Sequence, residues 1–135
     1  MPELVAMPQI TALYAGLLGL MAVVLSILVG RYRTPSADRR VSIGDGGRPE
    51  VLVAMRRHAN FVEYVPLMLI LIALLELNKV DGTVIHVMGA TLVGVRASHA
   101  WGMQPDDARG IFRFIGAVGT TLLLVVSSIW AIAVF

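Results

Sequence analysis

Residues 56–75 read RRHANFVEYVPLMLILIALL, a run that changes from polar to almost wholly apolar along its length. The apolar stretch within it, residues 61–75, is too short to cross about 30 Å of hydrocarbon, which takes about 20 helical residues. It reaches that length only if the helix extends through polar residues back to about Pro49. Because a polar helical extension at membrane depth should line protein or water instead of lipid, this stretch predicts both a span and a site.

Three further apolar stretches lie at residues 10–29, 83–95 and 111–135. The first and last are long enough to span a membrane, and the middle one needs a polar extension to about Trp101. We therefore expect one all-α, integral-membrane domain over residues 1–135. Its four transmembrane helices should form a bundle and cover approximately residues 8–32, 49–77, 81–102 and 107–134.

Composition supports a lipid environment for a chain of 135 residues, since 57% of them are hydrophobic and the mean hydropathy is +0.79. A soluble domain of this size could not bury so much apolar surface. The absence of cysteine excludes a disulfide scaffold and any thiolate metal site from this chain. Ten Arg and one Lys leave a net charge of only +2, which does not suggest a nucleic-acid partner.

Basic residues concentrate in two of the connections between apolar stretches. Residues 31–60 hold seven Arg, and further Arg follow the third stretch, whereas the connection at residues 76–81 holds one Lys and two acids. Basic loops stay in the cytoplasm, so both termini should face outward and the first and third loops inward. Small residues four apart predict close helix packing at three pairs: Ala12/Gly16, Ala15/Gly19 and Ala90/Gly94.

One candidate site lies on the second helix, where Arg56, Asn60 and Glu63 are spaced i, i+4 and i+7 and so share a stripe. A cation, an amide and an anion on one face could hold a zwitterion, with Arg binding carboxylate and Glu binding ammonium. The structural alternative is a salt bridge between Glu63 and an arginine, with other arginines reaching the interface. An acid at membrane depth favours the functional interpretation for Glu63.

A second stripe on the third helix contains Arg96, His99 and Met103. His99 could be a hydrogen-bond partner, a proton carrier or an interfacial histidine. On the fourth helix, Arg113 shares a face with Gly116 and either serves a site or anchors the helix on its cytoplasmic side. No second histidine or carboxylate lies at metal-ligand spacing, so no metal is expected.

The chain resembles the MAPEG family, the membrane-associated proteins in eicosanoid and glutathione metabolism, over essentially its whole length. The resemblance rests on four spans, a long basic first loop and three motifs: Arg56…Asn60…Glu63-Tyr-Val-Pro66, Arg96-Ala-Ser-His99, and Arg113 followed by Gly116. It looks most like the short bacterial inner-membrane members.

The resemblance implies a homotrimer that binds glutathione between neighbouring subunits near the cytoplasmic side. Carried over by position, the glutathione contacts are Arg31, Arg56, Asn60, Glu63 and His99. Arg113 matches the arginine that stabilises the glutathione thiolate, if one extra residue is allowed in the preceding loop. The implied activity is a membrane-bound glutathione transferase or peroxidase, whose second substrate is a hydrophobic electrophile or lipid from the bilayer.

Four positions depart from the family pattern. Ala59 replaces a further arginine, Met103 replaces a tyrosine one turn after the histidine, and Phe114 follows Arg113 where a hydroxyl occurs in a prostaglandin-forming member. A tyrosine one turn beyond is replaced near Gly116 and Ala117. Glutathione binding tolerates these losses more easily than catalysis does. A non-catalytic lipid-binding or regulatory protein of the same fold therefore stays open, as does a structural or transport role unrelated to thiols.

Overall fold

The computed structural model describes residues 7–106 and 110–134. Its elements are four α-helices and a short 3-10 helix: α1 (Gln9–Arg33), η1 (Ala37–Arg39), α2 (Pro49–Leu77), α3 (Gly82–Gly102) and α4 (Gly110–Ala133). The described residues contain no strand, so the all-helical prediction is confirmed. The polar residues before 61 are helical as expected, because α2 begins at Pro49.

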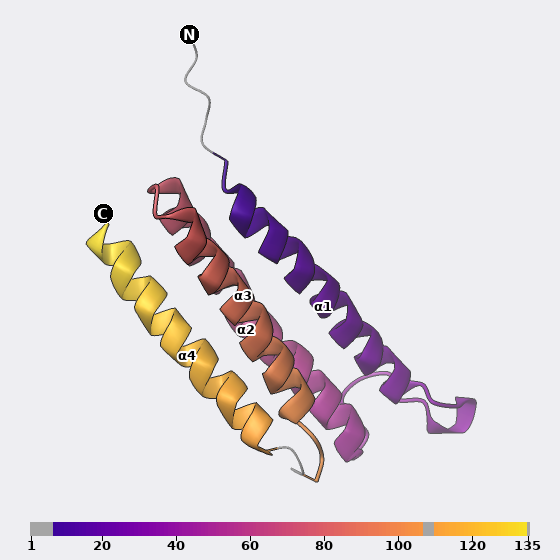
Figure 1. The fold of residues 1–135 in the computed structure, drawn as a ribbon. Coiled ribbons are helices and arrows are strands. Elements are labelled where there is room, and N and C mark those ends of the chain that lie inside the picture. Colours follow the sequence, from indigo (N-terminus) through magenta and orange to yellow (C-terminus); the bar gives the residue numbers. More distant parts are fainter. Residues whose placement is uncertain (1–6, 107–109, 135) are drawn as a thin grey trace.

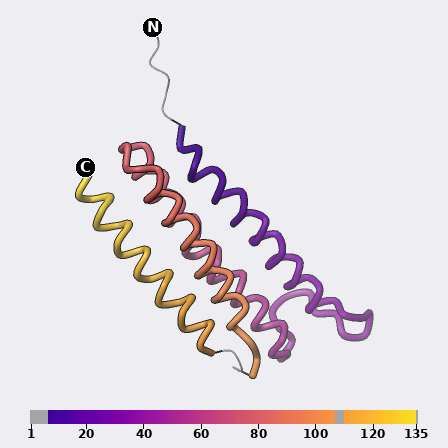
Figure 2. Tube along the Cα trace, in the orientation of Figure 1, coloured from indigo at the N-terminus to yellow at the C-terminus, as the bar shows by residue number. Residues whose placement is uncertain are grey.

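The helices run side by side, with α2 and α3 between α1 and α4 (Figure 1). The start of α1, the end of α4 and the α2–α3 turn lie at one end of the bundle. The loop at residues 34–48 and the connection after α3 lie at the other end, as the trace in Figure 2 also shows. The start of α1 and the end of α4 therefore share one end, opposite the loop at residues 34–48, which holds Arg39, Arg40 and Arg48.

Three of the described helices, α1, α2 and α4, are long and apolar enough to cross a membrane, with mean hydropathies of 2.5, 1.8 and 2.0. The 21-residue α3 does not belong to this group. Its sequence is interrupted by His86, Arg96 and His99, which lower its hydropathy. Outward apolar side chains such as Leu20 on α1 and Ile132 on α4 are more than two-thirds exposed, as lipid-facing residues would be.

The bundle core is built around α2. Its inward side chains pack against α1 and α3 to form one buried apolar cluster, which consists of Leu18, Leu25, Phe61, Val65, Met68, Ile72, Leu75, Ile85, Met88 and Leu92. Helix α3 packs most extensively against α4, and α1 packs most extensively against α2.

Glycines mark the closest helix contacts, but not at the predicted pairs. A Cβ added at Gly16 or Gly94 would meet no atom within 4 Å, so these positions do not bring helices together within the chain. That prediction is wrong for packing within the described chain. The closest backbone approaches instead join α3 to α4: a Cβ on Gly116 would lie 2.5 Å from the backbone nitrogen of His99, and one on Gly102 would overlap the backbone of Arg113. Gly89 of α3 faces the ring of Tyr14 on α1, which a Cβ at this position would overlap.

The first turn of α1 is capped by a side chain from another helix. Its own N-cap residue, Pro8, provides no side-chain hydrogen bond. The Glu76 carboxylate, at the end of α2, accepts hydrogen bonds from the backbone N–H of Ile10 (2.9 Å), the backbone N–H of Thr11 (2.8 Å) and the Thr11 hydroxyl (2.6 Å). The carboxylate thus satisfies free N–H groups at the positive end of the helix dipole and joins α1 to α2.

Candidate functional site

A buried cation, Arg96, lies between α2, α3 and α4, in the half of the bundle nearer the loop at residues 34–48. Its side chain is 2% exposed. Nη2 donates to Oδ1 of Asn60 at 2.7 Å, and Nη1 donates to Oγ1 of Thr120 at 3.4 Å. The guanidinium carbon lies 5.7 Å and 6.0 Å from the ring centroids of Phe61 and Tyr64. These contacts are polar or aromatic, and no carboxylate in the described chain pairs with this charge.

Beside Arg96 is a cavity of about 50 Å³, lined by Asn60, Tyr64, Arg96, His99, Ala117, Thr120 and Thr121. His99 is 5% exposed. Nε of Arg96 and Nδ1 of His99 are buried without a hydrogen-bond partner. Leaving buried polar groups unpaired costs free energy, so the cavity is suited to a polar or anionic group that accepts from the guanidinium.

The local sequence explains how these groups meet. Arg96 and His99 are three residues apart on α3, which places them on the same face. Gly116 lets α4 approach the backbone of His99. Thr120, one turn further on, donates to the Gly116 carbonyl at 2.7 Å and presents its oxygen to Arg96. The small residue on α4 thus allows the contact, and the hydroxyl that follows it binds the cation.

The structure brings together two of the predicted site residues, Asn60 and His99, at this cavity. Arg56 and Glu63 lie on the same helix as Asn60 but are exposed. The predicted stripe is therefore divided, with Asn60 directed toward Arg96 and the two charged residues directed outward. Glu63 makes no ion pair with the described residues, so the salt bridge considered as its structural alternative is not found within the chain.

The remaining predicted residues, Arg31 and Arg113, line two separate hollows on the surface. Arg31 is exposed at the end of α1, in a hollow of about 700 Å³ that also includes Tyr32. Arg113 is exposed on α4, in a hollow of about 330 Å³ with Phe114 and other neighbours.

Arg57, next to the predicted site residue Arg56, makes a contact that stabilises the bundle. Its Nε donates to the carbonyl of Met103 at 2.8 Å, and its Nη2 donates to the same oxygen. This carbonyl belongs to the C-cap of α3, where helix carbonyls lack partners within their own helix. Arg57 therefore ties the end of α3 to α2.

Sequence reasoning placed Arg96 on the stripe of His99 but assigned it no role, and it gave no role to Tyr64 or Thr120. The available signal was an arginine within an apolar helix, three residues before a histidine, because intramembrane charges usually face the bundle interior and serve a function. Nothing in the sequence near Thr120 identified its contact. Among the described residues, no group of three or more histidine or acidic residues could hold a metal ion.

Comparisons with known proteins agree with this architecture. The chain is 34% identical over 125 residues to the inner membrane protein YecN of Escherichia coli strain K12, covering 90% of this chain and 92% of the relative. The YecN protein of E. coli O6:H1 matches to the same extent. No solved structure is significantly similar. The inner-membrane relative and the three apolar helices show that this chain is an integral inner-membrane protein. The MAPEG family model matches residues 11–133, and the chain therefore belongs to the MAPEG family.

Proposed function

We propose that this protein binds glutathione and transfers its thiolate to hydrophobic electrophiles that reach the site through the bilayer, with hydroperoxide reduction as a related activity. The observation that carries the proposal is the buried Arg96 with no acidic partner in the described chain, next to the unpartnered Nδ1 of His99. A buried charge is costly unless it is paired. An anionic ligand would supply the missing partner, and membership of a family named for glutathione metabolism favours this tripeptide.

The size of the cavity indicates that one subunit does not hold the whole ligand. Small-molecule sites measure about 300–1,000 Å³, whereas the Arg96 cavity measures about 50 Å³. In our proposal a homotrimer completes the site. The exposed Arg31, Arg56 and Glu63 of one subunit then contact glutathione together with residues of its neighbour.

In the proposed complex, Arg56 binds a glutathione carboxylate and Glu63 binds its ammonium group. Asn60 and His99 orient the peptide. Arg96 donates to Asn60 and lines the cavity with His99, so it positions both residues and offers its unpartnered Nε to an anionic group of the ligand. These assignments use charge complementarity: each exposed charge on α2 matches an opposite charge on the zwitterionic peptide.

Arg113 supplies the chemistry by stabilising the thiolate. A thiol of this kind has a pKa near 8.5, so little thiolate exists at neutral pH. Lowering that pKa by about two units requires about 2.7 kcal/mol of differential stabilisation, which a guanidinium in a water-poor site can supply. The thiol proton passes to water. With a chloronitrobenzene, the sulfur forms a bond to the ring carbon and chloride leaves.

The proposal includes an arrangement in the membrane. All four helices span the bilayer, with both termini outside and the two connections at the other end of the bundle in the cytoplasm, where glutathione is available. Hydrophobic electrophiles dissolve in the hydrocarbon and reach the site from the side. The arginines at the end of α1, in the loop at residues 34–48 and near the start of α2 support this arrangement, because basic segments are retained on the cytoplasmic side.

Glutathione titration of the purified protein in detergent tests binding. The half of α3 that carries His99 also carries the exposed Trp101, whereas Trp130 lies near the far end of α4. We expect glutathione to quench fluorescence in the Trp130→Phe protein but not in the Trp101→Phe protein. Isothermal calorimetry of the unmodified protein provides a second readout, and absence of binding by both methods would exclude the proposal.

Turnover with a chloronitrobenzene tests the catalytic step. Arg113→Ala should abolish most conjugation while glutathione still binds. Unchanged conjugation in that variant would show that Arg113 does not stabilise the thiolate.

A non-catalytic, lipid-binding or regulatory role is the second candidate, and Phe114 favours it. This side chain is 63% exposed beside Arg113, at the position where a hydroxyl would assist chemistry, and it makes the hollow there more apolar. Glutathione binding without turnover of any generic electrophile would support this candidate. Lack of glutathione binding would instead favour the structural or transport role.

A further inference from the structure

The loop at residues 34–48, which joins α1 to α2, is held against the end of α1. The backbone N–H of Val41 donates to the carbonyl of Arg33 at 2.9 Å. Nε of Arg33 donates to the carbonyl of Gly44 at 3.2 Å, and its Nη2 contacts the sulfur of Met55. Because Arg33 is the last residue of an apolar helix long enough to span a membrane, these bonds keep the loop at the membrane boundary.

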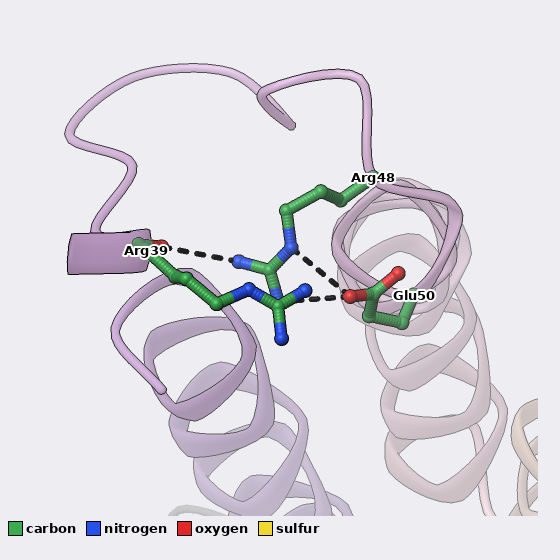
Figure 3. A network of polar contacts seen from close by, with 3 residues as sticks. All are labelled: Arg39, Arg48 and Glu50. Carbon is green, nitrogen blue, oxygen red and sulfur yellow. Dashed lines mark hydrogen bonds and ion pairs between the residues drawn. The ribbon is translucent and has the colours of Figure 1, made fainter. Parts of the chain in front are cut away.

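A second set of contacts ties η1 to the start of α2 (Figure 3). Arg48 pairs with Glu50 at 2.8 Å and donates to the carbonyl of Arg39 at 3.3 Å. In Figure 3 the Arg39 side chain is directed toward the same Arg48–Glu50 pair. Glu50 therefore pairs with Arg48, and the loop keeps an excess of positive charge.

The acids of the loop are engaged within it. Asp45 accepts a hydrogen bond from the backbone N–H of Gly47 at 2.9 Å. A hydrogen bond with Ser36 lowers the pKa of Asp38 and so keeps it charged. Arg40 is exposed and makes no hydrogen bond or ion pair with the described residues. Its guanidinium is therefore not held by any group of the described residues.

Close to this arginine in sequence is the most exposed large apolar side chain of the described residues, Ile43, at 91%. The loop at the membrane boundary thus presents a cation and, three residues later, an exposed aliphatic side chain. This pair matches the bilayer surface, where a layer of headgroups covers the acyl chains. The guanidinium suits headgroup phosphates, and the isoleucine suits the upper acyl region.

We propose that this loop lies on the bilayer surface and binds anionic phospholipid headgroups, with Arg40 at the phosphate and Ile43 inserted beside it. The lipid would hold the loop flat against the membrane, next to the start of α2. This site is separate from the Arg96 cavity and does not depend on glutathione binding.

The absence of cysteine from the chain allows a clean test. Ser42→Cys, at an exposed position, gives a single site for an environment-sensitive fluorophore between the two proposed contacts. The full-length protein is placed in phosphatidylcholine nanodiscs containing equal small fractions of nitroxide-labelled phosphatidylglycerol or nitroxide-labelled phosphatidylcholine. Quenching by each labelled lipid reports how often that lipid lies at the loop.

We expect labelled phosphatidylglycerol to associate about fivefold more strongly than labelled phosphatidylcholine, which corresponds to about 1 kcal/mol for one arginine near an anionic surface. Arg40→Gln should remove most of this preference, and Arg40→Lys should retain it. Ile43→Ser should reduce quenching by both lipids. A label at Pro105→Cys, exposed in the other connection at the same end, should show a weaker preference that Arg40→Gln leaves unchanged.

Three results would overturn the proposal. A Ser42 label that neither lipid quenches would place the loop in water. Equal quenching by the two lipids, or a preference that survives Arg40→Gln, would show that this arginine selects no anionic headgroup. Circular dichroism of each variant confirms that the helices are intact, and because these positions are exposed we expect no change there.

Discussion

The interhelical cap made by Glu76 should contribute strongly to stability and little to function. Replacing it in Glu76→Ala removes the acceptor of three hydrogen bonds to the first turn of α1. Thr11, which donates two of them, is 5% exposed, so water cannot easily replace the carboxylate. The variant should therefore loosen α1 from α2 at the end of the bundle that carries the N-terminus.

The contacts allow the magnitude to be worked out. Hydrogen bonds within membrane proteins contribute about 0.6 kcal/mol each, so three give about 2 kcal/mol. The charge of the carboxylate at the helix N-terminus adds about 0.3–1 kcal/mol. We expect Glu76→Ala to lower the free energy of unfolding by about 2–3 kcal/mol. Glu76→Gln should cost about 1 kcal/mol, because one oxygen still accepts but the charge is lost.

Reversible unfolding in mixed micelles, followed by circular dichroism, measures these changes. Glu63→Ala is the matched control, since Glu63 lies on the same helix but is exposed and makes no ion pair with the described residues. It should change stability by less than about 0.5 kcal/mol. Under the proposed function, the effects on glutathione affinity are reversed: Glu63→Ala weakens binding and Glu76→Ala does not.

Equal stability losses in Glu76→Ala and Glu63→Ala would refute the reasoning, because the three hydrogen bonds of Glu76 would then stabilise the protein no more than an exposed carboxylate does. So would a Glu76→Gln variant as unstable as Glu76→Ala. Faster hydrogen exchange at the first turn of α1 in Glu76→Ala provides a local readout of the same effect.

Four other substitutions test the helix packing, the turn between α2 and α3 and the buried charge. Gly116→Ala should lower the free energy of unfolding by about 1–3 kcal/mol, because its Cβ would lie 2.5 Å from the backbone of His99. Gly16→Ala is the control: open space surrounds this position, so the substitution should leave stability unchanged or raise it in the same unfolding assay. Lys79 has a φ of 62° between α2 and α3, so Lys79→Gly should raise the unfolding midpoint slightly, and a lower midpoint would contradict this. Arg96→Met should keep or increase the free energy of unfolding, because it removes a buried charge at similar volume. The same variant should bind glutathione at least tenfold more weakly in a calorimetric titration.

Part of the candidate site follows from helical spacing alone. Arg96 and His99 are three residues apart, and any α-helix places such residues on one face. Once a helix is predicted here, the two side chains are therefore expected to line the same cavity, as they do. The stripe on α2 shows where this reasoning stops. Asn60 and Glu63 are also three residues apart but differ by about 60° around the helix axis. A small rotation of α2 within the bundle decides which of them is inside.

Long-range partners could not be predicted from local patterns. Glu76 reads as part of a polar turn, yet it caps the first turn of α1 through Ile10, which lies 66 residues earlier in the chain. The small-residue pairs of α1 look suited to close packing, but the closest backbone approaches lie at Gly102 and Gly116 between α3 and α4. Each of these contacts depends on the relative position of two helices, which neither helix encodes by itself.

The sequence by itself determined the number, type and approximate extent of the helices, because the free energy of placing apolar residues in hydrocarbon depends only on local composition and length. Only the tertiary structure decided which face of each helix is inside. In lipid, an outward face is as apolar as the core, so hydrophobic periodicity does not mark the inward side. Helix orientation is set instead by close-packed glycines and by polar contacts such as the hydrogen bond from Arg96 to Asn60.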